Sequence, residues 1–194
     1  MGEKTVTELA DRLPPRLGAI VKAMVAIKLN ISAAATLVLP ATFLLVVIFR
    51  YILHSDLFAY EEWLLPVSFW LYFLASGVGS YEDSQIRADI LESFFKSPRA
   101  IWWRKVILYS VECSISLVMV YWGYLMIEND VLSYPFWQKT IAMKIPFFVP
   151  HLGIFVGLVF MAFYGLLHLY VLLRFGPKVI EEDLLAKARD MEAV

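Results

Sequence analysis

Four long apolar stretches alternate with shorter polar ones along this chain. From Leu29 to Phe49 no residue is charged, so 21 consecutive residues carry no formal charge. A helix of that length extends about 30 Å, roughly the thickness of the hydrocarbon core of a bilayer. Similar reasoning applies to three later stretches. We therefore predict four transmembrane helices, at about 29–49, 64–81, 106–127 and 147–173.

Two polar segments show helical spacing of their apolar residues. After the second predicted span, Ile86, Ile90 and Phe94 share one face while charged residues lie elsewhere, which predicts an interfacial amphipathic helix over about 84–96. The helical spacing of apolar residues before Lys28 predicts that residues 1–28 form a cytosolic or interfacial amphipathic segment, with Lys28 off its apolar face. The alternative is that this segment extends the first span into the cytosol.

The distribution of positive charge predicts the orientation of the spans. If both termini are cytosolic, the inside segments 1–28, 82–105 and 174–194 hold fourteen of the 17 Lys and Arg residues. The outside loops then hold only the other three. Cytosolic loops of membrane proteins carry such an excess of Lys and Arg. We therefore expect both termini inside, with residues 29–173 as the membrane domain and 174–194 as a cytosolic tail.

Composition supports an all-α integral membrane protein. Apolar residues make up 60% of the 194 positions and charged residues only 18%, too much apolar surface for one small soluble domain. A formal net charge of -1 and the absence of a dense basic run give no sign of a nucleic-acid partner. We expect phospholipid to surround the protein instead. A single cysteine, Cys113, excludes an intramolecular disulfide.

The sequence offers little for catalysis or for a cofactor. It has no Gly-rich phosphate loop and no HExxH motif, so we expect neither an enzyme nor a cofactor in this chain. His151 and His168 are 17 residues apart, about 25 Å on a helix, too far to ligate one metal together. Each could pair with a histidine of another chain, which leaves a haem-binding anchor subunit of a respiratory enzyme as an alternative.

Two features inside the predicted spans favour a subunit of a larger assembly. Glu112 lies in the third span, where an ionisable group is costly and calls for a functional or structural role. Gly153 and Gly157 form a GxxxG strip in the fourth span, which allows another helix to approach closely. A single intramembrane Glu provides few polar groups for a substrate path, which argues against a free-standing small transporter. We keep that function as a second alternative.

The segment from Arg50 to Leu91 resembles the small membrane subunit of TRAP transporters, the DctQ type. In that family an Arg ends the first span, an acidic pair opens the second, and an Asp lies in the segment that follows. Here these positions are Arg50, the pair Glu61 and Glu62, and Asp89. The motif covers about a fifth of the chain, and the architecture resembles the family throughout.

This chain departs from the family pattern at several positions. A Trp often found before the acidic pair is replaced in the region of Ala59 and Tyr60. A small position usually held by Gly is Ala75, and the usual His of the exit segment is Gln85. The basic pair after the second span reads Tyr81 and Glu82. These departures affect any specific role carried over for the exit segment, and they leave the architecture intact.

The resemblance implies one part of a tripartite secondary transporter in a bacterial or archaeal inner membrane. An extracytoplasmic solute-binding protein would deliver an organic anion, and a large multispan membrane subunit would move it by symport with sodium. The present chain would brace the large subunit, and the sodium sites would lie in that subunit. The residues we assign to a partner interface are Arg50, Glu61, Glu62, Gln85, Arg87, Asp89, Glu112, Gly153 and Gly157.

Overall fold

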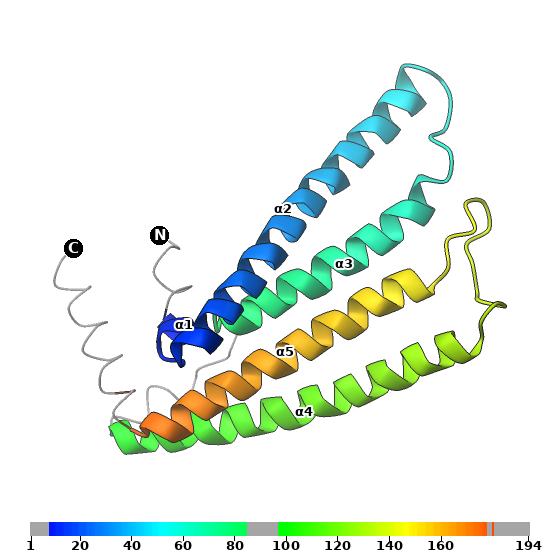
Figure 1. The fold of residues 1–194 in the computed structure, drawn as a ribbon. Helices are drawn as coiled ribbons and strands as arrows, with labels where there is room; N and C mark the ends of the chain where they lie inside the picture. Colours follow the sequence, from blue (N-terminus) through cyan, green and yellow to red (C-terminus); the bar gives the residue numbers. More distant parts are fainter. Residues whose placement is uncertain (1–7, 85–96, 178–179, 181–194) are drawn as a thin grey trace, which may run out of the picture.

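The computed structural model describes residues 8–84, 97–177 and 180, and most of these residues are helical (Figure 1). A short helix α1, Glu8–Asp11, precedes four long ones. Their bounds are α2 Pro15–Tyr51, α3 Tyr60–Tyr81, α4 Pro98–Leu132 and α5 Phe148–Phe175. All four long helices are long and apolar enough to cross a membrane. The prediction of an all-α protein with four such helices is confirmed; its orientation stays a prediction.

Local sequence accounts for where the helices begin and end. Pro15 and Pro98 each occupy the first turn of their helix, where a missing N–H is tolerated because the first amides of a helix have no intrahelical partner. Gly176 follows α5 with a φ of 64°, in the region that favours glycine, and so ends the helix. Glu61 and Glu62 lie in the first turn of α3, where carboxylates interact favourably with the helix dipole.

Helix α2 is longer than the first predicted span. It runs without a break from Pro15 through Lys28 and Pro40 to Tyr51. The sequence pattern separated residues 1–28 from the span, whereas in the structure residues 15–28 are part of the same helix. Where residues 1–28 lie relative to the bilayer stays a prediction. The predicted interfacial helix over about 84–96 lies outside the described residues, apart from Ser84.

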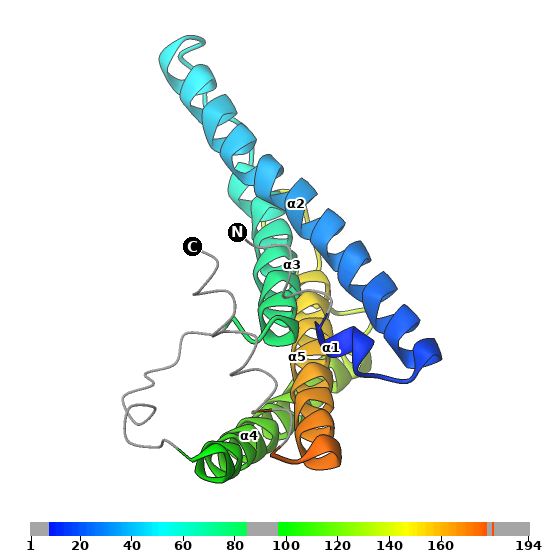
Figure 2. The same cartoon turned by 90° about the vertical axis from the view of Figure 1, so that its left-hand side faces the viewer.

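The long helices form a single open layer in the order α2, α3, α5, α4. Helix α2 packs against α3, α3 against α5 and α5 against α4. Figure 1 shows α2 and α4 at opposite edges of this layer, and the turned view in Figure 2 shows that the layer is twisted. Most residues on the outer sides of the two edge helices are exposed, so a large apolar surface faces outward on both edges.

Glycines set the spacing between α3 and α5. A Cβ added at Gly157 would lie 2.5 Å from Phe73 Cβ and 2.8 Å from the Phe73 carbonyl oxygen, and one added at Gly153 would lie 3.1 Å from the Trp70 indole ring. Both glycines are buried. The predicted GxxxG strip thus packs inside the subunit. This corrects its assignment to a partner interface, because the partner helix is α3 of the same chain.

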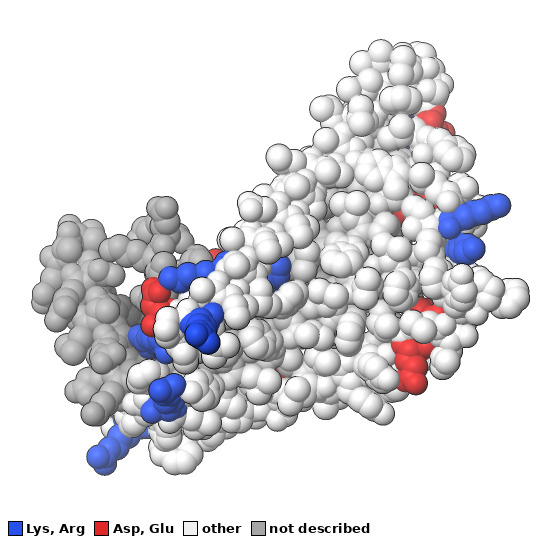
Figure 3. Space-filling view, in the orientation of Figure 1, with Lys and Arg blue, Asp and Glu red and all other residues white. Residues whose placement is uncertain are grey.

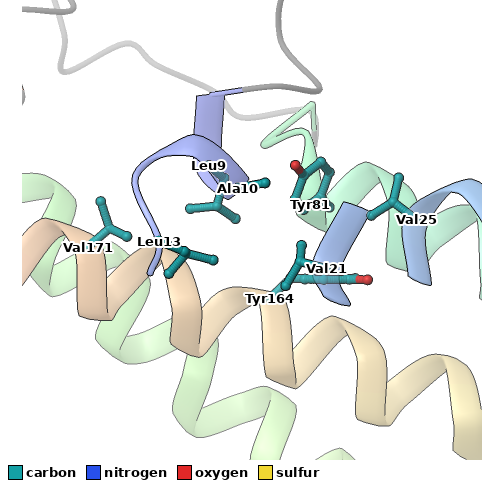
Figure 4. Packing of buried hydrophobic residues seen from close by; sticks show 8 residues of the cluster. All are labelled: Leu9, Ala10, Leu13, Val21, Val25, Tyr81, Tyr164 and Val171. Carbon is teal, nitrogen blue, oxygen red and sulfur yellow. The ribbon is translucent and has the colours of Figure 1, made fainter. Parts of the chain in front are cut away.

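One end of the layer, which we call the α1 end, contains the main apolar cluster (Figure 4). Helix α1, through Leu9 and Ala10, and Leu13 after it pack with side chains of α2, α3 and α5. The cluster consists of Leu9, Ala10, Leu13, Val21, Val25, Tyr81, Tyr164 and Val171. Burial of these side chains joins α2 to the rest of the layer, since α2 otherwise packs mainly against α3.

Charged side chains gather at the two ends of the layer in the view of Figure 3. Lys and Arg lie mainly at the α1 end, and a broad band with few charges separates them from the opposite end. We call that opposite end the loop end, because it carries residues 52–59 and 133–147, which join the helices. A charge-poor band between two polar ends is typical of a protein that crosses a bilayer.

We expect Gly157→Ala to destabilise the protein, because the added methyl group would collide with the backbone of α3. Overpacking of this kind typically costs about 1–3 kcal/mol, so the thermal unfolding midpoint of the purified protein in detergent should fall clearly. Gly79→Ala is the matched control: its Cβ would meet only Ser84 Oγ, at 3.5 Å. Equal midpoints for the two variants would contradict the packing described here.

Candidate functional site

The loop end contains the best-defined polar site on the described part of the chain. Glu62, in the first turn of α3, accepts hydrogen bonds from two backbone amides of the loop between α4 and α5. Its Oε1 lies 2.8 Å from the Ala142 nitrogen and its Oε2 lies 2.7 Å from the Met143 nitrogen. One carboxylate therefore ties residues 80 positions away to the start of α3. Such charge-assisted bonds are stronger than bonds between neutral groups.

The same loop is also closed by its own hydrogen bonds. The Thr140 nitrogen donates to the Ile145 carbonyl oxygen over 3.0 Å, and the Ile145 nitrogen donates to Thr140 Oγ1 over 2.9 Å. Phe147 N donates to the Gln138 carbonyl oxygen over 3.0 Å. The loop therefore has a defined shape, and it presents Ile141 almost fully to the outside, at 96% exposure.

Helices α4 and α5 are joined at the loop end by a second polar pair. His151 Nδ1 lies 2.7 Å from Asp130 Oδ2, with both side chains about one quarter exposed. The Trp137 indole N–H donates to the Asp130 carbonyl oxygen over 2.7 Å, and the Trp137 ring stacks on Phe148. These contacts fix the end of α4 against the start of α5.

Glu61 and Glu62 have different environments, although the sequence treats them as a pair. Glu62 is half-buried and its two oxygens contact the loop, whereas Glu61 is exposed. Arg50, the last-turn cation of α2, lies 3.5 Å from Asp56 in an exposed ion pair. Of the predicted interface residues at this end, Glu61 is therefore the acidic group that a partner can reach.

The other predicted interface residues are distributed over the molecule. Glu112 is half-buried on α4, next to buried Cys113, far along the chain from the acidic pair. Gln85, Arg87 and Asp89 lie outside the described residues. Among the described members, Arg50, Glu61 and Glu62 lie at the loop end, whereas Gly153 and Gly157 pack against α3.

Both membrane histidines have partners within the chain. His168 Nε2 lies 3.0 Å from the Tyr81 carbonyl oxygen, and its ring stacks on Tyr109 at a centroid separation of 5.6 Å. A contact with a carbonyl oxygen requires a proton on that nitrogen. His151 contacts Asp130 at the other end of α5. Both arrangements match the role of a buried polar group that is satisfied internally.

Lys28 is a buried cation that the sequence pattern did not predict. Its side chain is only 2% exposed, and Nζ donates to the Tyr164 hydroxyl oxygen over 2.7 Å. Nζ also lies 4.2 Å from the centroid of the Phe160 ring and 4.0 Å from that of Tyr164. A Cβ at Gly77 would lie 3.7 Å from Nζ. Lys28 thus reaches from α2 past α3 to α5, enclosed by aromatic rings that attract a cation.

The sequence contains a signal that could have located this residue. The buried positions of α2 are Gly18, Val21, Val25, Lys28, Ser32 and Thr42. Val21, Val25, Lys28 and Ser32 are spaced by four, three and four, which places these four on one helical face. We expected Lys28 off the apolar face because that face was taken to include Leu17, Ile20 and Ile27, which are exposed in the structure. The expectation was wrong because α2 continues past this position, so that the lysine lies between helices.

The polar contacts at these sites hold the helices together and order a surface loop. Both properties are expected of a subunit in a larger assembly. Within residues 8–84, 97–177 and 180, no group of three or more His, Cys, Asp or Glu side chains is placed to hold a metal ion. The polar contacts described above join helices or order a loop. The geometry thus defines a multi-pass helical membrane protein. Its polar groups join the ends of the helices and order the loop between α4 and α5.

Comparison with known families identifies this membrane protein further. Residues 39–175 match the family model described as tripartite ATP-independent periplasmic transporters, DctQ component. That match covers well over half of the chain, and the chain belongs to this family. No curated protein and no solved structure matches the chain. The protein is therefore a small membrane subunit of a TRAP transporter, as the resemblance of residues 50–91 indicated.

We expect Glu62→Gln to loosen the loop between α4 and α5. A glutamine oxygen can accept one of the two amide bonds, but its NH2 group would face the other amide donor. The amides of Ala142 and Met143 should then exchange with deuterium several-fold faster, as measured by mass spectrometry of peptides covering 138–147. Glu61→Gln is the matched control and should leave this exchange unchanged. Unaltered exchange in Glu62→Gln would show that the carboxylate does not hold the loop.

Proposed function

We propose that this chain is the scaffold subunit of a sodium-coupled TRAP transporter that imports an organic anion. It braces the large membrane subunit, which carries the substrate and sodium sites, and it helps an extracytoplasmic binding protein to dock. The complex lies in the inner membrane of a bacterium or archaeon, with both termini of this chain in the cytosol. Membership of the DctQ family, a component of tripartite transporters, carries this proposal.

The open helix layer supports a bracing role. A layer one helix thick leaves both edge helices, α2 and α4, largely uncovered. Apolar helix surfaces in a bilayer gain little from burial as such and associate through shape and polar contacts. A stiff layer with fixed internal spacing offers such a surface to a larger subunit. Lys28 is buried between the helices and contacts Tyr164 of α5. Its contact therefore lies within the layer and not on the surface offered to a partner.

The polar groups of the loop end support a docking role. In the proposed orientation this end faces outward, where the binding protein arrives. The loop ordered by Glu62 and the exposed carboxylate of Glu61 then form a preformed surface. Surfaces that are ordered before binding lose less conformational entropy on association.

Reconstitution tests the proposed function directly. When the three components are purified and placed in liposomes, uptake of an organic anion should require all three and an inward sodium gradient. This chain should also be recovered with the large subunit in about equal amount. Transport by this chain alone would favour a free-standing transporter, and recovery with haem and a redox subunit would favour the respiratory anchor. Either result would overturn the proposal.

Replacement of both Glu61 and Glu62 by Gln is expected to weaken uptake or docking, and the single variants separate their roles. Glu61→Gln should raise the concentration of binding protein needed for half-maximal uptake while leaving uptake at saturation near wild type, because it removes one exposed charge. Glu128→Gln, also exposed near the end of α4, is the control. Equal concentration dependence for Glu61→Gln and wild type would remove Glu61 from the docking surface.

A further inference from the structure

The loop between α4 and α5 presents apolar side chains outward. Ile141 is 96% exposed, Phe136 89% and Met143 47%. The loop is nevertheless ordered, because Thr140 and Ile145 are joined by two hydrogen bonds across its tip, residues 141–144. Apolar side chains gain free energy when they leave water. A tip that holds an isoleucine outward in this way is therefore suited to an apolar environment.

The position of α3 indicates the depth at which this tip lies. Residues 63–81 carry no charge, whereas an acidic pair stands on either side of them, at 61–62 and at 82–83. The 22 residues of α3 extend about 33 Å, little more than the hydrocarbon core of about 30 Å. Carboxylates are costly inside that core. The first turn of α3 must therefore lie at the edge of the core.

Glu62 brings the tip of the loop to this same level. Its carboxylate oxygens accept hydrogen bonds from the backbone nitrogens of Ala142 and Met143 over 2.8 and 2.7 Å. Ile141 directly precedes these two residues. The tip therefore lies within one side-chain length of the first turn of α3, beside the edge of the hydrocarbon core.

Two exposed lysines stand on either side of the tip. Lys139 and Lys144 are both exposed, and the backbone at Lys139 pairs with that at Pro146 in a short antiparallel bridge. At the level of the lipid headgroups, a lysine can lay its alkyl chain along apolar groups and keep its ammonium group beside a phosphate. An apolar tip between two cations thus has the chemistry of a surface that contacts phospholipid.

We propose that the tip of the α4–α5 loop inserts into the lipid leaflet at the loop end, with Ile141 among the upper acyl chains and Lys139 and Lys144 at the phosphates. Glu62 holds the tip at this depth from within the protein. The contact sets how the loop end sits in the membrane, which goes beyond the proposed function and does not depend on it. Docking through the exposed carboxylate of Glu61 uses a different group of the loop end.

Depth-dependent quenching on the full-length protein in vesicles tests the contact. The vesicles contain phosphatidylcholine and phosphatidylglycerol, and the fluorophore NBD is attached to Ile141→Cys in a Cys113→Ala background. A nitroxide near the top of the lipid acyl chain should quench this label several-fold more than a label at Ser55→Cys, an exposed polar position in residues 52–59. Aqueous iodide should show the reverse order. Val118→Cys, exposed on α4 between its ends, is the lipid-facing control.

Lipid quenching at Ile141→Cys that is no stronger than at Ser55→Cys overturns the proposal. If iodide then reaches the label, the tip lies in water, and if neither quencher reaches it, a second copy of this chain covers it. Thermal unfolding midpoints equal to that of the Cys113→Ala background show that the labelled variants are folded. The measurement needs neither the large subunit nor the binding protein, so a failure of the proposed function is distinguishable from a failure of this inference.

Discussion

The close approach of α3 and α5 is the contact on which the rest of this structure depends. Gly157 allows the backbone of α3 to lie against α5, and Gly153 leaves room for the Trp70 indole. That indole donates to the Val149 carbonyl oxygen over 3.1 Å, which fixes the two helices along their length. The edge helices are then attached to this central pair, α2 through α3 and α4 through α5. Small residues serve this purpose because van der Waals contact drives helix association in a bilayer.

Polar contacts fix the relative positions of helices and loops where apolar packing alone does so weakly. At the loop end, Glu62 orders the loop between α4 and α5, and Asp130 with His151 joins the ends of those helices. Deeper in the layer, Lys28 joins α2 to α5 through Tyr164. A carboxylate or ammonium group in such surroundings is stable only with a suitable partner. These partners therefore fix the position of each charged group within the layer.

The family and the open layer together relate this architecture to transport. A DctQ component belongs to a tripartite transporter, and in the proposed function this chain braces the large membrane subunit. In that proposal, the two edge helices and the ordered loop end provide the surfaces for bracing and docking. Glu62 contacts the loop within the subunit, whereas Glu61 is exposed, so adjacent residues of one motif have different environments.

The sequence by itself determined the number of long apolar helices and the all-α class, because a bilayer imposes a length and composition that are visible in one chain. The motif between Arg50 and Leu91 indicated the family. The tertiary structure alone decided which polar residues meet. Glu62 contacts amides 80 residues away, and Gly157 packs on α3 rather than on a partner. Lys28 became an interior residue because α2 continues past it and α5 supplies Tyr164. Such pairings depend on long-range packing, which helical periodicity does not encode.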